Sequence, residues 1–148
     1  MKRIVAAACV VAAGAVAWLL LGQTRPDAQT ATADSPTAPV NGAPIVEVVL
    51  PDALSDEARI GKTIFEAKCA ACHGANAAGQ QGVAPPLVHV IYEPSHHGDE
   101  SFQIAAARGV RAHHWPFGNM PPVEGVTRAD VATVIAYIRE LQRANGIR

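Results

Sequence analysis

Hydrophobic and polar residues divide the chain into three consecutive parts. An uncharged, largely apolar run spans residues 4–21, directly after Lys2 and Arg3. Residues 23–44 are then rich in Ala, Thr, Pro, Asp, Gln and Ser and contain hardly any large apolar side chain. Beyond residue 51, apolar side chains recur at helical spacing. We therefore expect an apolar segment at residues 1–22, a flexible Pro/Ala/Thr-rich linker at 23–50 and one folded domain at 51–148.

The N-terminal segment has the form of an export signal or a signal anchor, because a basic pair precedes an apolar core. About 18 apolar residues reach the lower end of the length that spans a bilayer as a helix. Residues 22–26 offer no clear small-x-small cleavage site, and Ala31-Thr32-Ala33 stands far from the apolar run. We expect an uncleaved transmembrane helix with Lys2 and Arg3 in the cytoplasm, and signal cleavage is the alternative.

Three helices are predicted in the folded domain. The first begins at Ser55, whose side chain can cap a helix with two carboxylates in its first turn. A short helix is expected over residues 101–108, with Gly109 as its C-terminal stop. A capping-box-like start at Thr127 introduces the last helix. Its apolar stripe consists of Val131, Val134, Ile135, Ile138 and Leu141.

Gly61 predicts how the first and last helices meet, since a residue without a side chain permits a close crossing. Phe65 and Tyr137 would lie near that contact. The segment 45–50 is apolar again and could be a short strand or an extended segment packed on the domain.

Composition limits the size of the core. The chain has 148 residues, of which only 5% are aromatic, so a bound apolar group would add core that the side chains lack. A formal net charge of -1 suggests neither nucleic acid nor a strongly charged partner. Of the three cysteines, Cys9 lies in the N-terminal apolar run, and no disulfide framework is indicated.

The other two cysteines belong to Cys69-Ala70-Ala71-Cys72-His73, the spacing typical of covalent attachment of haem c. Each thiol can add across one haem vinyl group, which places the following imidazole beneath the iron. A thioredoxin-like redox pair would need a βαβ context, and a zinc site would need two more ligands at matching spacing. We expect Cys69 and Cys72 to hold one haem c and His73 to be the proximal iron ligand.

The order of motifs from about residue 51 to residue 143 resembles bacterial class I cytochrome c with a single haem. The cysteine motif is followed by a Gly-rich loop, Ala84-Pro85-Pro86-Leu87, a short helix, Met120-Pro121-Pro122 and an amphipathic helix. The resemblance implies an all-α fold of three to four helices around the haem, with iron held by His73 and a methionine. It also implies that the Pro85 carbonyl accepts the proximal imidazole's proton, and that Trp115 donates its indole N–H to a haem propionate.

Residue counting also favours Met120 as the second iron ligand, because the only other methionine is the initiator. The rivals are a core methionine that fills a gap, and a histidine ligand from His89 or from the pair at 113–114. His96-His97-Gly98-Asp99 could hold a second metal ion. Two adjacent residues seldom point at one ion, so we interpret these histidines as exposed or hydrogen-bonded side chains.

Iron with two protein ligands has no open position for substrate, which indicates a single-electron carrier rather than an enzyme. We expect it to receive electrons from a quinol-oxidising complex or a dehydrogenase and to pass them to a terminal oxidase or reductase. The expected location is the bacterial inner membrane, with the haem domain in the periplasm. The alternatives are a haem subunit of a larger oxidoreductase, or a sensor or peroxidase with a labile sixth ligand.

Overall fold

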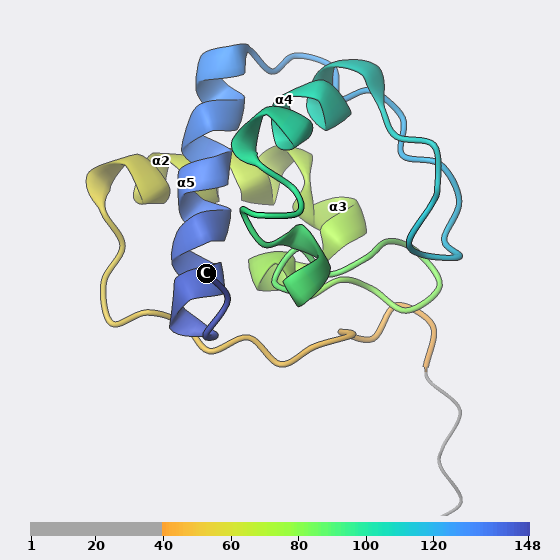
Figure 1. The fold of residues 1–148 in the computed structure, drawn as a ribbon, viewed down its shortest axis with the longest axis horizontal. Coiled ribbons are helices and arrows are strands. Elements are labelled where there is room, and N and C mark those ends of the chain that lie inside the picture. Colours follow the sequence, from red (N-terminus) through yellow and green to blue (C-terminus); the bar gives the residue numbers. More distant parts are fainter. Residues whose placement is uncertain (1–39) are drawn as a thin grey trace, which may run out of the picture. The chain divides into compact units, whose positions relative to one another are not determined.

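The computed structural model describes residues 40–148, which fold into an all-α unit (Figure 1). The predicted anchor at 1–22 and the linker as far as residue 39 lie outside the described residues. Within residues 40–148, no helix is long and apolar enough to cross a membrane. The elements are α2 (Asp56–Lys68), α3 (Ala70–His73), η1 (Ala75–Ala77), η2 (Val90–Tyr92), α4 (Asp99–Arg108) and α5 (Arg128–Ala144).

The caps predicted from sequence set the ends of the two longest helices. Ser55 caps α2, its side chain accepting a hydrogen bond from the Ala58 amide. Thr127 and Asp130 form the reciprocal capping box of α5. The short helix α4 begins at Asp99, two residues earlier than expected, because Gly98 adopts an extended conformation and Asp99 and Glu100 occupy the first turn.

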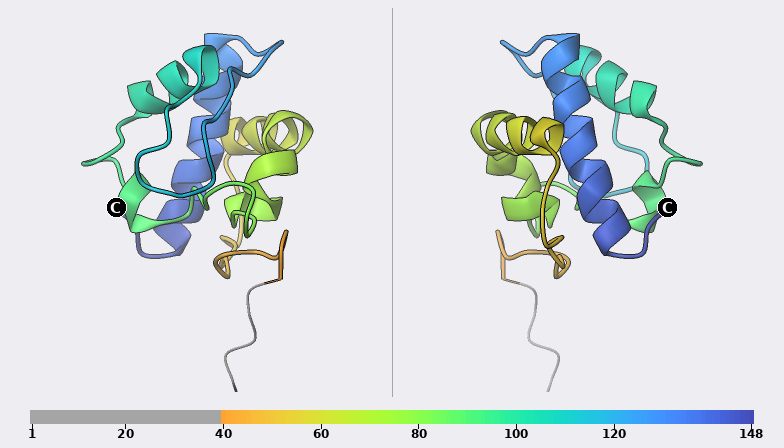
Figure 2. Two further views of the ribbon diagram at one scale, coloured as in Figure 1. Left: turned by 90° about the vertical axis from the view of Figure 1, so that its right-hand side faces the viewer. Right: turned by 90° about the vertical axis from the view of Figure 1, so that its left-hand side faces the viewer.

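Helix α5 is the centre of the fold and packs against both α2 and α4 (Figure 2). At the crossing with α2, a β-carbon added to Gly61 would stand 1.8 Å from the carbonyl oxygen of Thr133. One helical turn farther on, the rings of Phe65 and Tyr137 meet at 5.7 Å between centroids. Glycine is therefore required at this crossing, and the two aromatic rings form the buried centre of the core.

We expect Gly61→Ala to lower the free energy of unfolding by about 1–3 kcal/mol, since the two helices must move apart to admit the methyl group. Urea unfolding of the haem-loaded protein measures the change. Thr63→Ala, on the exposed side of the same helix, is the matched control and should change stability by less than about 0.5 kcal/mol. A stabilised Gly61→Ala protein would show helix propensity alone and would contradict the close crossing.

Two buried polar residues of α5 hold the segment between α3 and α4. The Arg139 guanidinium donates to the carbonyl oxygens of Tyr92 (2.7 Å) and His97 (2.6 Å) and to the carboxylate of Asp99 (2.9 Å). The Gln142 amide donates to the carbonyls of Leu87 and Tyr92, both at 2.9 Å. These bonds satisfy loop carbonyls that would otherwise be buried without a partner.

Residues 45–50 lie against the helical unit. The amides of Ile45 and Val46 donate to the carbonyl of Ala78, and Asn145 bonds both the amide and the carbonyl of Val49 at 2.9 and 2.8 Å. The sequence predicts that the linker extends to residue 50, but these bonds attach residues 45–49 to the folded unit through their backbone. The side chains of Val49 and Leu50 stay exposed.

Candidate functional site

The Cys69–His73 segment forms one helical turn at the C-terminal end of α2. The Cys69 amide still donates to the carbonyl of Phe65 in α2, while the amides of Cys72 and His73 both donate to the Cys69 carbonyl at 3.1 and 2.9 Å. Residues three apart in a helical turn lie on the same side. Cys69 and Cys72 accordingly line one cavity together.

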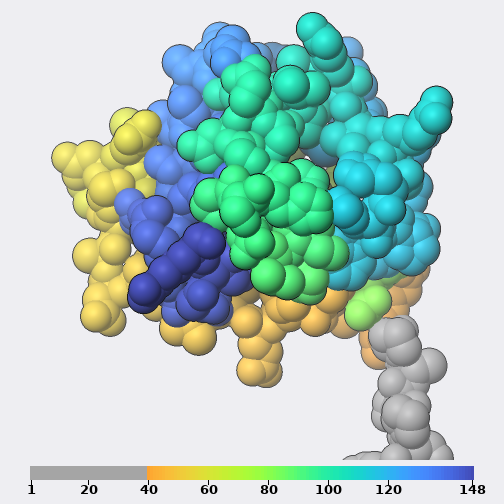
Figure 3. Space-filling model, in the orientation of Figure 1, coloured from red at the N-terminus to blue at the C-terminus, as the bar shows by residue number. Residues whose placement is uncertain are grey.

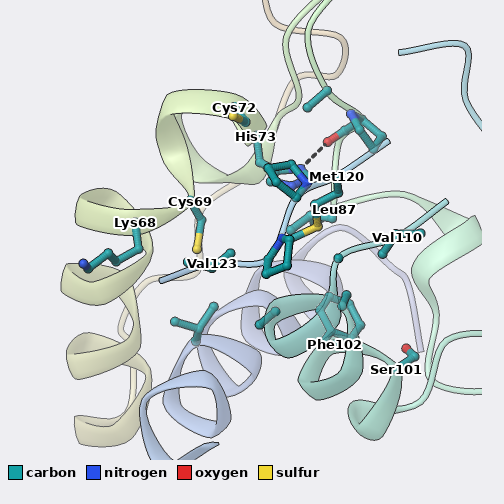
Figure 4. Close-up of a pocket in the computed structure, with 18 of the residues that line it drawn as sticks. Lys68, Cys69, Cys72, His73, Leu87, Ser101, Phe102, Val110, Met120 and Val123 are labelled. Atoms are coloured by element: carbon teal, nitrogen blue, oxygen red, sulfur yellow. Dashed lines mark hydrogen bonds between the residues drawn. The ribbon is translucent and has the colours of Figure 1, made fainter. Parts of the chain in front are cut away.

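His73 is buried and oriented by the backbone of a distant loop. Its Nδ1–H donates to the carbonyl of Pro85 at 2.9 Å, as drawn in Figure 4. Burial lowers the pKa of His73, and this effect outweighs the hydrogen bond to Pro85, which raises it. The imidazole is therefore neutral at neutral pH, with the lone pair on Nε2 available to a metal.

Neither Cys69 nor Cys72 forms a disulfide bond, and their exposure differs. Cys69 is partly buried, whereas Cys72 is exposed. Burial, followed by the charge of the neighbouring Cys72, raises the pKa of Cys69 to about 11. Cys69 is thus a protonated thiol at neutral pH, and addition of its S–H across a carbon–carbon double bond would release no leaving group.

The cavity beside this turn has a volume of about 880 Å³. Its walls come from α2, α4, α5 and the segment that follows α4, and most of its lining is apolar (Figure 4). Small-molecule and cofactor pockets usually measure roughly 300–1,000 Å³. The lining includes Ile64, Phe65, Leu87, Phe102, Val134 and Ile138.

Met120 lines the same cavity from the segment after α4. Its amide donates to the carbonyl of Val110 and its carbonyl accepts from the Val110 amide, both at 2.9 Å. The Val123 amide then donates to the carbonyl of Ala106 in α4 at 2.8 Å. Met120 is thus paired with the residue that follows the end of α4 by two positions, and Val123 is bonded to α4 itself. The two prolines after Met120 restrict the backbone further.

Trp115 has a buried polar atom without a partner. Its indole Nε1 makes no hydrogen bond within residues 40–148. The Tyr92 hydroxyl is nearby but outside hydrogen-bond geometry. The indole ring meets the His89 ring edge-on, with 5.2 Å between the ring centroids, and stacks on the Phe117 ring with 5.8 Å between centroids. A buried N–H without a partner costs about 1–3 kcal/mol, so this donor favours an acceptor bound in the cavity that Trp115 lines.

A sequence model described as Cytochrome c matches residues 58–142, more than half of the chain. The chain belongs to the cytochrome c family. A comparison with curated proteins gave no match. The family carries covalently bound haem c and functions in haem-based electron transfer, and its all-α fold agrees with the helices described above.

The residues of this cytochrome c fit a haem. The cavity has the required size and apolar lining, and two free thiols three residues apart stand at its wall. The neutral imidazole of His73 offers a nitrogen lone pair, and the unpaired N–H of Trp115 can donate to a haem carboxylate. The six site residues predicted from sequence, Cys69, Cys72, His73, Pro85, Trp115 and Met120, therefore all line one cavity.

The remaining histidines are not among these six, although His97, His113 and His114 also line the cavity. His89 caps η2 by accepting a hydrogen bond from the Ile91 amide at 3.2 Å. The histidine pairs at 96–97 and 113–114 precede and follow α4 in the sequence. In the folded chain the rings of the two pairs are in contact. Two His-His pairs flanking one short helix were the signal available in the sequence, but only the folded chain brings the pairs into contact.

Proposed function

We propose that this cytochrome c is a single-electron carrier in which His73 and Met120 hold the haem iron and Cys69 and Cys72 form the thioether bonds. The observation that carries the proposal is that His73 and Met120 line one cavity from segments far apart in the sequence, together with the free cysteines. The bound haem supplies iron that changes between the ferric and ferrous states.

The chain's own residues hold the two ligand atoms in place. Pro85 accepts the Nδ1 proton of His73, which fixes the tautomer and the orientation of the ring. The bridge between Val110 and Met120 fixes the backbone that carries the thioether sulfur. A thioether ligand favours the reduced state and raises the potential. If His73 and Met120 both held the iron, no iron position would remain for a substrate.

Gly109 keeps the Met120 backbone in place. Gly109 has φ +75°, and a β-carbon there would stand 2.4 Å from the Met120 carbonyl oxygen. We expect Gly109→Ala to displace Met120, so that part of the reduced protein binds carbon monoxide. Gly118→Ala is the matched control, because Gly118 also has positive φ, +88°, but has open space around it. Equal carbon monoxide binding by the two variants would contradict this role of Gly109.

The N-terminal sequence supports a membrane-tethered carrier whose haem domain lies in the bacterial periplasm. A basic pair followed by an apolar run is the pattern of a signal anchor, and a polar linker would let the domain move near the membrane. Electrons would come from a quinol-oxidising complex or a dehydrogenase and pass to a terminal oxidase or reductase.

The charge distribution favours weak, transient docking of those partners. Residues 51–148 include nine basic and ten acidic residues, and the only lysines among them are Lys62 and Lys68. Strong electrostatic steering would need a larger excess of one charge. Small contact areas are usual for redox encounters. The exposed Cys72 and Pro121 would place the haem edge at the docking surface.

A redox titration with absorption spectra, carried out on membrane and soluble fractions, tests the proposal. We expect one haem c that titrates as a single one-electron component in the membrane fraction. Recovery of the full chain in the soluble fraction would contradict the tether. Fixed stoichiometric co-purification with a larger oxidoreductase would contradict a free carrier and favour a haem subunit.

A further inference from the structure

We propose that His96, His97 and His114 bind one divalent transition-metal ion, Cu²⁺ or Zn²⁺, at a site separate from the haem iron. One nitrogen from each of the three rings lies within 4.8 Å of the corresponding nitrogens of the other two. The ring centroids are 4.6 to 5.2 Å apart. Three nitrogen donors from two separate segments therefore converge on one point.

Two surface segments create this convergence. His96 and His97 end the turn after η2, and His114 lies in the segment between α4 and Met120. The segments that carry them, green and light blue in Figure 3, lie side by side on the surface. The turn that bears His97 is fixed to α5 by the hydrogen bond from Arg139 to the His97 carbonyl, 2.6 Å long.

Only small movements of the rings would complete a metal site. Zinc–nitrogen bonds of about 2.0–2.1 Å in tetrahedral geometry separate the nitrogens by roughly 3.4 Å. The nitrogens already lie within 4.8 Å of one another. His96 and His114 are exposed, so rotation of their side chains can shorten these distances without disturbing the core.

A backbone carbonyl orients the third ligand. The Nδ1–H of His97 donates to the carbonyl of Ile91 at 2.6 Å, which leaves Nε2 as the free lone pair. Metal-binding histidines commonly donate their other N–H to a carbonyl or carboxylate in this way. His113 has the same arrangement, donating to the carbonyl of Arg111 at 2.8 Å, and its ring lies 4.3 Å from that of His114.

The histidine cluster has no acidic partner to explain it as a structural feature. Among residues 40–148, no salt bridge joins a histidine to a carboxylate. The nearest acidic side chain in sequence, Asp99, binds Arg139 instead. Imidazoles packed at these distances repel one another when protonated. If the three imidazoles are neutral and bind one cation, three metal–nitrogen bonds take the place of that repulsion.

The donor set selects the kind of ion. Imidazole nitrogen suits zinc and copper better than magnesium or calcium, which prefer oxygen ligands. Copper(II) is bound more tightly than zinc by most nitrogen sites. Ligation of the haem iron does not explain the cluster, because one axial position accepts one imidazole and three converge here.

Calorimetric titration of the full-length, haem-loaded protein, prepared without a histidine tag, tests the site with CuCl₂ and ZnCl₂ as separate probes. We expect one equivalent of either ion to bind with Kd below about 10 μM, copper more tightly, and the haem spectrum to stay unchanged. His97→Asn, and separately His96→Asn or His114→Asn, should weaken binding by at least roughly tenfold. His96 and His114 are exposed, so the variants at these two positions leave the fold intact.

His89→Asn is the matched control, since asparagine keeps the cap of η2 and His89 is not one of the three ligands. Its affinity should equal that of the unmodified protein. If the unmodified protein bound copper and zinc with Kd above about 10 μM, the proposed site would be wrong. Unchanged metal affinity in the three ligand variants would also contradict it. A change of iron ligation in the haem spectrum of His114→Asn would also overturn it, because His114 would then serve the haem.

Discussion

The Cys69→Ser/Cys72→Ser double variant is expected to retain no covalently bound haem. Each thioether forms when a thiol S–H adds across a haem vinyl group, and serine hydroxyls do not replace thiols in that reaction. Acid–acetone extraction followed by a haem stain of the denatured protein measures the loss. Without its cofactor the domain also loses the group that fills its cavity of about 880 Å³, so the yield of folded protein should fall as well.

Cys9→Ser is the control, because Cys9 is the third cysteine and lies in the N-terminal apolar run. It should keep the full amount of covalent haem. The single variants separate the two thiols further: with either Cys69 or Cys72 retained, one thioether should remain and the haem should resist extraction. Covalent haem in the double variant would show that the attachment residues are assigned wrongly.

Met120→Leu is expected to open the sixth position of the haem iron. Leucine has nearly the volume of methionine, so packing is preserved while the sulfur ligand is lost. The reduced variant should bind carbon monoxide rapidly. Its reduction potential should fall by roughly 0.1–0.3 V, within the approximately 0.8 V range that axial ligands set in haem proteins. Absorption spectra and a redox titration measure both effects.

Met120→His is the complementary variant, since it supplies a new ligand from the same backbone position. We expect it to restore a low-spin spectrum that carbon monoxide does not change, with a potential still below that of the unmodified protein. If Met120→Leu instead keeps the unmodified spectrum and potential, Met120 is a core residue. The iron would then be held by a histidine such as His89 or His114.

The framework of helices was predictable from local patterns. Ser55 and Thr127 cap their helices as the sequence indicated, and each cap joins groups only three residues apart in the chain. The crossing at Gly61 was also predictable, because a glycine in an apolar helical face has few other purposes. Residues 45–50 were harder to place, since their pairing with Ala78 and Asn145 joins segments far apart in sequence.

The candidate site shows the same division. The cysteine motif is local, and its spacing alone predicted the haem attachment residues and the imidazole that follows them. The unpaired N–H of Trp115 and the carbonyls bound by Arg139 depend on how distant loops pack. No periodicity in the sequence marks such contacts. The contact between the two histidine pairs that flank α4 also depends on the packing of distant loops, so the sequence did not predict it.

We propose that His73 and Met120 both bind the haem iron and leave it no open position. The most direct measurement is the absorption spectrum of the unmodified protein, oxidised and then reduced under carbon monoxide at neutral pH. We predict a sulfur-to-iron charge-transfer band in the oxidised protein and no change of the reduced spectrum with carbon monoxide. Absence of the band together with rapid carbon monoxide binding would contradict the claim and indicate a ligand-binding sensor or a peroxidase.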